Sequence, residues 1–212
     1  VLVADVFVES ERKHLTFWMA IASLAVTAAS LLMTGPDERV LTFSGSYVSD
    51  PFSQILKLAS VGLVALGFLY ARDNLKENGL LRGEFFILGL FGLLGIMIMM
   101  SANSLLTMYL GLETLALSQY ALVAYERNSP TAAESAMKYF VLGAIASGAL
   151  LYGISWVYGV TGALHFDQIA SVLEQQPELN GVPLWFGIAF MIVGIAFKFG
   201  AVPFHMWLPD VY

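Results

Sequence analysis

The sequence contains no cysteine and few charged residues. Without cysteine, the chain forms no disulfide, no thiolate metal site and no cysteine-ligated iron–sulfur cluster. Only 12% of its 212 residues are charged, whereas a soluble domain carries about 25%. The formal net charge of -6 also excludes the basic surface with which proteins bind nucleic acid. The composition therefore excludes a disulfide scaffold, a nucleic-acid-binding module and an ordinary soluble domain.

Several motifs of catalysis are missing too. The sequence has no glycine-rich phosphate loop, no metal-ligand spacing and no nucleophile with a matching base, and His14, His165 and His205 are too scattered for a metal site. We therefore expect no cofactor and no metal in this chain. No secretory signal pattern is present. Because the chain starts with Val1 and stops at Tyr212 beside an unfinished motif, we expect a fragment.

Apolar residues dominate instead, at 58% of the chain with a mean hydropathy of +0.74. A membrane-spanning helix needs about 20 mostly apolar residues. We expect an all-α, polytopic helical membrane protein whose single transmembrane domain covers residues 1–212. The domain is predicted to contain the tail of one helix followed by six spans: 15–33, 52–71, 84–100, 105–125, 130–157 and 183–202.

Loop charges predict the orientation, because cytoplasmic loops are enriched in Lys and Arg. Successive loops alternate between the two sides of the membrane. Arg39 and Lys57 fall on one side, and Lys57 is close enough to a helix end for its ammonium to reach the polar region. The opposite side, which we predict to be cytoplasmic, receives Arg12, Lys13, Arg72, Lys76, Arg82 and Arg127.

The span that starts at residue 130 has a clear beginning and a face of small residues. Pro130 suits the first helical position, and Thr131 with Glu134 fits a capping box. Small residues at spacings of three and four favour close packing with another helix. These small residues are Gly143, Ala144, Ser147 and Gly148.

Glu113 stands near the middle of the span 105–125. A charge at that depth costs about 2.5–3.5 kcal/mol on insertion scales. The carboxyl group is therefore protonated, paired or in contact with water, and it serves either as a structural hydrogen-bond donor or as a proton-transfer site. Tyr109, Ser118 and Gln119 lie mostly one or two turns away and could help to hold water. We take Glu113 as a candidate proton-transfer residue.

Lys138 lies two turns into the next span, about 10 Å below its start. The structural alternative is a lysine whose ammonium reaches back to the membrane surface. A short loop joins its span to that of Glu113, so we expect the two helices to be antiparallel neighbours. Movement of Glu113 towards or away from Lys138 would then switch the lysine between holding and releasing a proton.

Lys198 is the third candidate, near the end of the last span. Pro203 has no N–H to donate to the carbonyl of Phe199, so we expect irregular backbone from about Phe199 to Pro209. Broken helices occur at membrane depth where protein or water satisfies the freed groups. His205 follows Lys198 by seven residues and would share its face if the helix barely bends. We take both as candidate proton carriers, with a structural role as the alternative for His205.

Three runs resemble the antiporter-like membrane subunits of respiratory complex I. They are Leu110-Gly-Leu-Glu-Thr-Leu-Ala-Leu, Glu134-Ser-Ala-Met-Lys-Tyr-Phe and Phe197-Lys-Phe-Gly-Ala-Val-Pro-Phe-His-Met-Trp-Leu-Pro-Asp-Val-Tyr. The resemblance implies an antiporter-like fold of two inverted repeats, each with a broken helix, of which this chain holds the first part. It also implies proton-transfer roles for Glu113, Lys138 and Lys198.

The resemblance makes one functional hypothesis the leading one. It is a non-redox, proton-translocating membrane subunit of NADH:quinone oxidoreductase, in which quinone reduction happens in other subunits. The expected partners are the other membrane subunits of complex I, the lipid bilayer, protons and internal water, with no nucleic acid, and the expected location is the bacterial inner membrane. Two alternatives stay open: a cation/proton antiporter subunit of the multi-subunit type, and a structural scaffold whose buried charges only pair with their neighbours.

Overall fold

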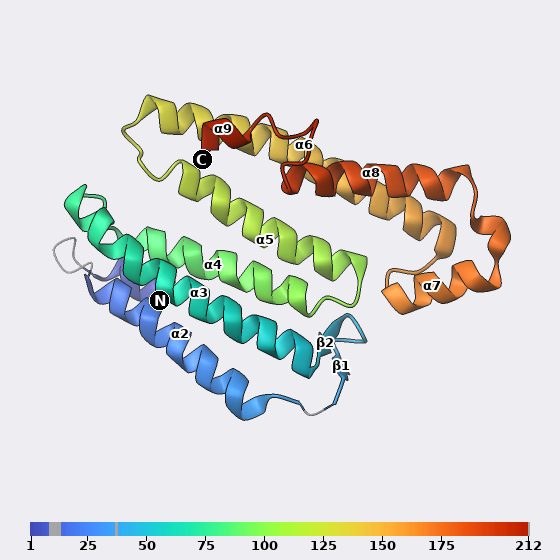
Figure 1. The fold of residues 1–212 in the computed structure, drawn as a ribbon, viewed down its shortest axis with the longest axis horizontal. Coiled ribbons are helices and arrows are strands. Elements are labelled where there is room, and N and C mark those ends of the chain that lie inside the picture. Colours follow the sequence, from blue (N-terminus) through green and yellow to red (C-terminus); the bar gives the residue numbers. More distant parts are fainter. Residues whose placement is uncertain (9–13, 37, 212) are drawn as a thin grey trace.

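The computed structural model describes residues 1–8, 14–36 and 38–211, which form a bundle of helices with one short β-hairpin (Figure 1). Strands β1 (Val40–Thr42) and β2 (Tyr47–Ser49) pair antiparallel, and a short 3₁₀ helix, η2, covers Pro177–Leu179. The α-helices are α1 (Leu2–Val6), α2 (His14–Thr34), α3 (Pro51–Glu77), α4 (Gly83–Met100), α5 (Leu105–Val123), α6 (Pro130–Thr161), α7 (Phe166–Gln175), α8 (Val182–Lys198) and α9 (Leu208–Val211).

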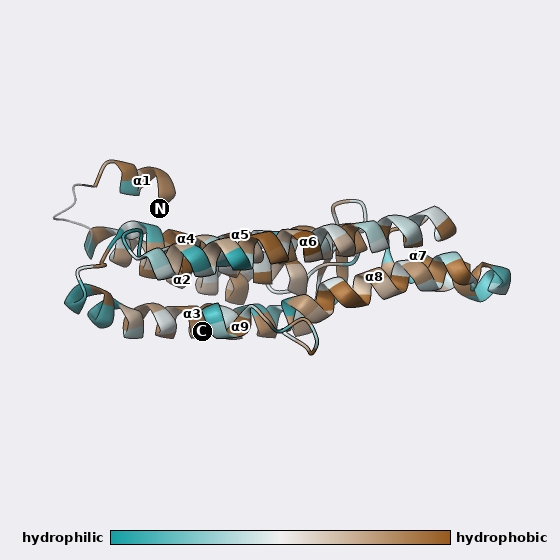
Figure 2. Ribbon diagram, turned by 90° about the horizontal axis from the view of Figure 1, so that it is seen from above, coloured by the Kyte–Doolittle hydropathy of each residue, from teal (hydrophilic) through white to brown (hydrophobic). Residues whose placement is uncertain are grey.

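Long apolar helices make up most of the molecule. Helices α2, α3, α4 and α6 are each long and apolar enough to cross a membrane, and α8 is a shorter apolar helix. Figure 2 shows hydrophobic residues along the helices, with hydrophilic residues gathered near the end of α3 and around α7. Large apolar side chains such as Val26, Leu63 and Ile145 are exposed on the helix surfaces, which suits contact with lipid tails. The predicted helical membrane architecture is confirmed.

Glycines allow two pairs of helices to meet backbone to backbone. Where α4 crosses α5, a Cβ added to Gly95 would lie 2.6 Å from the carbonyl oxygen of Gly111. Where α6 crosses α8, a Cβ on Gly153 would lie 2.6 Å from the carbonyl oxygen of Gly187, and Gly194 makes a similarly close contact with α6. Small residues permit such close approach between membrane helices. These contacts fix α8 along α6 and α4 along α5.

The start of α6 differs from the predicted capping arrangement. The helix begins at Pro130, but the capping group is the Ser129 hydroxyl, which accepts a hydrogen bond from the N–H of Ala132 at 3.2 Å. Thr131 lies two residues past the N-cap position, because the N-cap is Ser129, which precedes the first helical residue. Glu134, the other half of the predicted box, instead pairs with Lys138.

Two stretches between the predicted spans contain regular structure. The polar stretch 37–51 includes the β-hairpin, and the stretch 159–181 includes the amphipathic helix α7. Phe166, Ile169 and Leu173 recur at helical spacing on α7 and pack against the core formed by α5, α6 and α8. Both stretches are mostly polar, so no regular structure is predicted for them from the sequence. A surface helix such as α7 needs only one row of apolar residues, which a mostly polar composition does not reveal.

The ends of three helices also differ clearly from the sequence-based bounds, and α6 continues to Thr161, four residues past the predicted end of its span. α3 continues to Glu77, six residues past the predicted end of its span, and Leu75 on this extension packs against the core of α2, α3 and α4. α8 stops at Lys198, four residues before the predicted end. The charged residues that follow Ala71 made the predicted span of α3 too short. The apolar residues that follow Lys198 made the predicted span of α8 too long.

Lys57 is buried beneath the hairpin, so its ammonium meets a hairpin side chain rather than solvent. The residue is 3% exposed. Its Nζ donates to the Tyr47 hydroxyl at 3.0 Å and lies 4.9 Å from the ring centroid. The hairpin is held over it by the Val48 N–H, which donates to the Ser101 carbonyl at 2.8 Å, and by the Asn103 side chain, which donates to a hairpin carbonyl at 2.8 Å. Burial raises the pKa of the Tyr47 phenol, but the adjacent Lys57 and Ser101 together outweigh burial, so the pKa lies below its ordinary value.

Replacing Tyr47 by phenylalanine should destabilise the protein by about 1–3 kcal/mol, because the buried Lys57 ammonium loses its hydroxyl acceptor while the ring stays. Thermal unfolding of the purified protein measures this change. Tyr70→Phe is the matched control, since Tyr70 is 86% exposed and should tolerate the loss of its hydroxyl. Equal melting temperatures for the two variants would contradict the assigned role of Tyr47.

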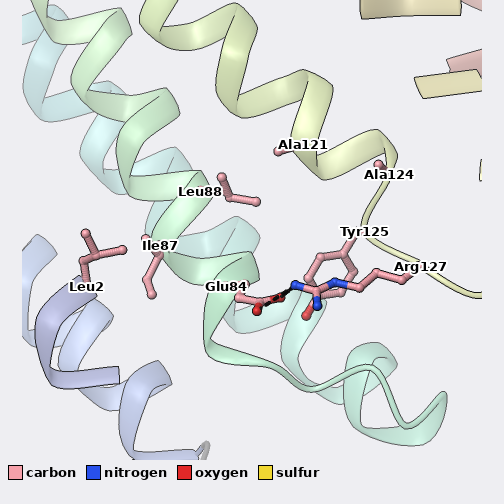
Figure 3. A pocket seen from close by; sticks show the side chains of 8 residues that line it. All are labelled: Leu2, Glu84, Ile87, Leu88, Ala121, Ala124, Tyr125 and Arg127. Carbon is pink, nitrogen blue, oxygen red and sulfur yellow. Dashed lines mark hydrogen bonds and ion pairs between the residues drawn. The ribbon is translucent and has the colours of Figure 1, made fainter. Parts of the chain in front are cut away.

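The end of the bundle opposite the hairpin gathers cations. One guanidinium nitrogen of Arg127 donates to both carboxylate oxygens of Glu84, each at 2.9 Å, beside a pocket of about 240 Å³ between α4, α5 and α1 (Figure 3). Next to it the Tyr125 hydroxyl donates to the Leu80 carbonyl at 2.7 Å. Arg72 lies near the C-terminal end of α3, at this same end of the bundle, and the side of the membrane that this end faces stays a prediction. Of the other residues in that prediction, Arg12 and Lys13 lie outside the described residues.

Helix α8, the last of the predicted spans, is followed by irregular backbone, as predicted. The backbone conformation of Gly200 ends the helix. Gly200 has a left-handed φ of 63°. Its N–H donates to the Phe197 carbonyl at 2.9 Å, while the Ala201 N–H donates to the Ala196 carbonyl at 2.8 Å. This pair of hydrogen bonds is the Schellman motif, which closes a helix C-terminus. Lys198 therefore occupies the last residue of α8.

The acceptor used at the break is not the one predicted. The sequence pointed to Phe199, whose carbonyl Pro203 cannot engage. In the structure the helix has already ended at Gly200, and the Trp207 indole N–H donates to the Phe197 carbonyl at 3.1 Å. Trp207 is buried at 4% exposure and folds the chain back on α8. The irregular segment thus packs as a cap over the end of the helix.

Candidate functional site

Glu113 and Lys198 form an ion pair between α5 and α8. The distance from Lys198 Nζ to Glu113 Oε1 is 3.3 Å. The Lys198 side chain is 12% exposed and the Glu113 side chain 22%. The same Oε1 accepts a short hydrogen bond from the hydroxyl of Ser147 on α6. Three helices therefore meet at one carboxylate, and a mostly buried charge pair with this added hydrogen bond satisfies the requirement for burying ions.

Lys198 has a second polar partner in Tyr120 of α5. The hydroxyl of Tyr120 lies 3.2 Å from Nζ, and the ring centroid lies 5.6 Å from it. Tyr120 follows Glu113 by seven residues, which is about two helical turns, so both side chains leave the same face of α5. The sequence carried this signal, but the prediction considered only the nearer polar residues of α5.

Backbone packing explains why the lysine reaches this position. α8 lies along α6 through its glycine contacts and ends at Lys198. α5 starts at Leu105 with a cap, in which the Thr107 N–H donates to the Ser104 hydroxyl at 3.1 Å, and this sets the register of Glu113. Residues 199–211, which include Trp207 and α9 and are called the closing segment below, cover the end of α8.

Lys138 has ion-pair partners other than Glu113 in this structure. Its Nζ lies 2.9 Å from Glu134 and 3.3 Å from Asp210 of α9, and its side chain is 46% exposed. α5 and α6 do pack together as predicted, but Glu113 contacts α6 at Ser147. That position is nine residues beyond Lys138, or about 14 Å along the helix. The structure therefore joins Lys138 to the closing segment rather than to the central carboxylate.

His205 lies in the irregular segment between α8 and α9, where it is exposed. The predicted shared face with Lys198 required a helix that barely bends, and α8 ends at Lys198. The backbone carbonyl of His205 accepts the N–H of Leu208 at 3.1 Å, so the residue helps to start α9. His205 therefore lies outside α8 and does not share a helix face with Lys198.

The other polar residues named around Glu113 have separate partners. The Ser118 hydroxyl donates to the Thr114 carbonyl within its own helix at 2.9 Å. The Gln119 side chain accepts from the Tyr139 hydroxyl at 3.0 Å. Tyr139 also stacks on Trp207, with ring centroids 4.5 Å apart. This second group of residues borders the site.

The chemistry available at the site is proton transfer. Lysine and carboxylate are acid and base groups, and the hydroxyls of Ser147 and Tyr120 provide further hydrogen-bonding atoms. Within the described parts of the chain, no three His, Asp or Glu side chains gather closely enough to hold a metal ion. A mostly buried acid–base pair is also the kind of arrangement that marks proton relays in membrane proteins.

Known proteins resemble this chain over its full length. A model of the family described as NADH:quinone oxidoreductase/Mrp antiporter, TM, matches residues 102–212. Curated relatives include NADH-quinone oxidoreductase subunit N of Alkalilimnicola ehrlichii and of Thiobacillus denitrificans, each 51% identical over 212 residues. All of this chain is covered in both comparisons, but it spans only 43% and 44% of those relatives.

Solved structures share the fold. A chain of respiratory complex I from Thermus thermophilus with bound aureothin is 30% identical, with a TM-score of 0.73 over 94% of this chain and 42% of that chain. A chain of the archaeal membrane-bound sulfane sulfur reductase is 26% identical, with a TM-score of 0.75 over 99% and 44%. A chain of the Mrp complex from Dietzia sp. is 22% identical, with a TM-score of 0.74 over 100% and 40%, which indicates the fold alone.

The family model covers more than half of the chain, including all the candidate residues. The apolar helices and the bacterial relatives agree with an integral protein of the inner membrane. The chain therefore belongs to the family of membrane-spanning subunits shared by NADH:quinone oxidoreductases and Mrp antiporters.

Proposed function

We propose that this chain is part of subunit N of a bacterial NADH–quinone oxidoreductase and that it carries protons through Glu113 and Lys198. The observation that supports the proposal most is the ion pair itself, which lies among three helices and includes the last residue of a broken helix. Identity of 51% to named subunits N supports the same assignment. The subunit would contribute proton translocation to the complex, while other subunits carry out the redox reaction.

The proposed mechanism follows from the charges. A protonated Lys198 is stabilised by the Glu113 carboxylate at 3.3 Å. If the two groups separate, the buried ammonium loses that stabilisation and gives its proton to a neighbouring acceptor such as water. When they approach again, the amine takes up another proton. A change of the α5–α8 distance would thus convert motion into proton transfer.

Lys138 and His205 remain candidates in this proposal, at different places from those first expected. The contact of Lys138 with Asp210 joins α6 to the closing segment that contains His205. Protons could pass from this more exposed region towards Lys198. The proposed partners are the other membrane subunits of the complex, the lipid bilayer and internal water, and no cofactor is assigned to this chain.

The test is Lys198→Met in the full complex, reconstituted into vesicles. We expect proton uptake to fall while assembly and uncoupled electron transfer stay near the parent level, since methionine fills the space but carries no proton. A scaffold role predicts the reverse, with assembly lost first. A cation/proton antiporter subunit, the other alternative, would show sodium- or potassium-dependent proton movement without NADH oxidation. Parent-level proton uptake in an assembled Lys198→Met complex would rule out the proposed carrier.

A further inference from the structure

Tyr120 places a neutral hydroxyl beside the charged pair. Its oxygen is 3.2 Å from Lys198 Nζ, and the residue is 7% exposed. Gly143 of α6 makes room for the hydroxyl, since a Cβ there would come within 2.0 Å of it. Packing alone would be served by phenylalanine, whereas this hydroxyl is in hydrogen-bonding contact with the ammonium.

The partners of Lys198 differ in the hydrogen bonds they can offer. An ionised Glu113 only accepts hydrogen bonds, and the hydroxyl of Ser147 is already donating to it. A tyrosine hydroxyl both accepts and donates. The ammonium form of Lys198 needs acceptors, but the neutral amine has a lone pair that needs a donor. Among the described groups hydrogen-bonded to Nζ, Tyr120 is the one that serves both forms.

We propose that Tyr120 is a positioning residue whose hydroxyl keeps Lys198 Nζ in place both before and after the proton leaves. The inference rests on the proposed function of the ion pair. While Lys198 is charged, the hydroxyl oxygen accepts an ammonium N–H. After the proton has left, attraction to Glu113 weakens, and the hydroxyl rotates to donate its own hydrogen to the amine nitrogen. The tyrosine O–H bond stays intact, so the proton still moves only between Lys198 and its acceptor.

The groups that face this contact come from three helices. Glu113 and Tyr109 face it from α5, and Tyr139 faces it from α6, with its ring centroid 4.7 Å from that of Tyr120. Lys198 faces it from α8. Lys138, elsewhere on α6, pairs with Glu134 and Asp210. Glu113 is therefore the one carboxylate among these facing groups, and a change in pH response on altering Tyr120 reports on the Glu113–Lys198 pair.

The experiment is Tyr120→Phe in the full reconstituted complex. Phenylalanine keeps the ring over Nζ and removes only the hydroxyl. We expect the rate of proton uptake to fall about tenfold, because a lost hydrogen bond to a charged group changes an equilibrium by at least that factor. The pH of half-maximal uptake should also move by about one unit, and uncoupled electron transfer should stay at the parent level. A structural role alone would lower the rate without moving the pH profile.

Tyr139→Phe is the matched control. It removes a hydroxyl from the same aromatic cluster, but that hydroxyl donates to Gln119 at 3.0 Å, so uptake and its pH profile should match the parent. If Tyr120→Phe assembles poorly, uptake normalised to electron transfer in the assembled fraction still decides the matter. A parent-like pH profile for Tyr120→Phe overturns the inference when Lys198→Met is defective. If Lys198→Met also takes up protons normally, the proposed function itself fails.

Discussion

Replacing Glu113 by glutamine is expected to reduce proton uptake by the full complex roughly tenfold or more, because a positioned proton-transfer group contributes about 10²–10⁴ to its step. Glutamine keeps the shape of the side chain but removes the charge that holds Lys198 at 3.3 Å. Lys138→Met should reduce uptake much less, since Lys138 is half-exposed and its pairs with Glu134 and Asp210 resemble surface ion pairs. Such pairs contribute about 0–1 kcal/mol.

A double variant distinguishes the two possible partners of Glu113. Combining Glu113→Gln with Lys198→Met should cost less than the sum of the single effects, because both residues act on one step. Combining Glu113→Gln with Lys138→Met should come closer to the sum. The measurement is proton uptake by reconstituted complex, with electron transfer followed in parallel. Stronger coupling of Glu113 to Lys138 than to Lys198 would show that the pair seen here is not the working one.

The second large effect is expected at Gly194, where α8 lies against α6. An added Cβ would come within 2.7 Å of the Leu150 Cβ and 2.8 Å of the Ala146 carbonyl oxygen. Gly194→Ala should therefore push the helices apart and destabilise the protein by about 1–3 kcal/mol, as overpacking does elsewhere. Gly194→Leu should prevent stable assembly. Because Lys198 is one turn further along α8, proton uptake should fall as well.

Gly148→Ala on α6 provides the control for helix propensity. A Cβ at Gly148 would have no neighbour within 4 Å, so alanine there should be neutral or slightly stabilising. Melting temperature and assembly yield of the two alanine variants give the comparison. Equal stability of Gly194→Ala and Gly148→Ala would mean that the α6–α8 contact is looser than the structure has it.

The membrane architecture could be predicted from the sequence because it depends on local composition. A run of about 20 apolar residues has few alternatives to a spanning helix. The break before α9 was equally visible, since Gly200 and Pro203 both oppose a continued helix. The amphipathic helix α7 and the hairpin were missed because each is short and lies within a polar stretch. Their apolar residues can be recognised as packing positions only when the core that they cover is known.

The sequence by itself determined which ionisable residues stand among the apolar helices, one acid and two bases, and the energetic cost of such charges makes each of them a candidate for function. Only the tertiary structure decided how they pair. α5 and α6 are neighbours, as the short loop between them required, yet their register brings Ser147 rather than Lys138 to Glu113. Lys198 comes from 85 residues away in the sequence to take that place. The physical reason is that pairing depends on helix register and on close contacts such as that of Gly194, and no local pattern encodes the distance between two helices.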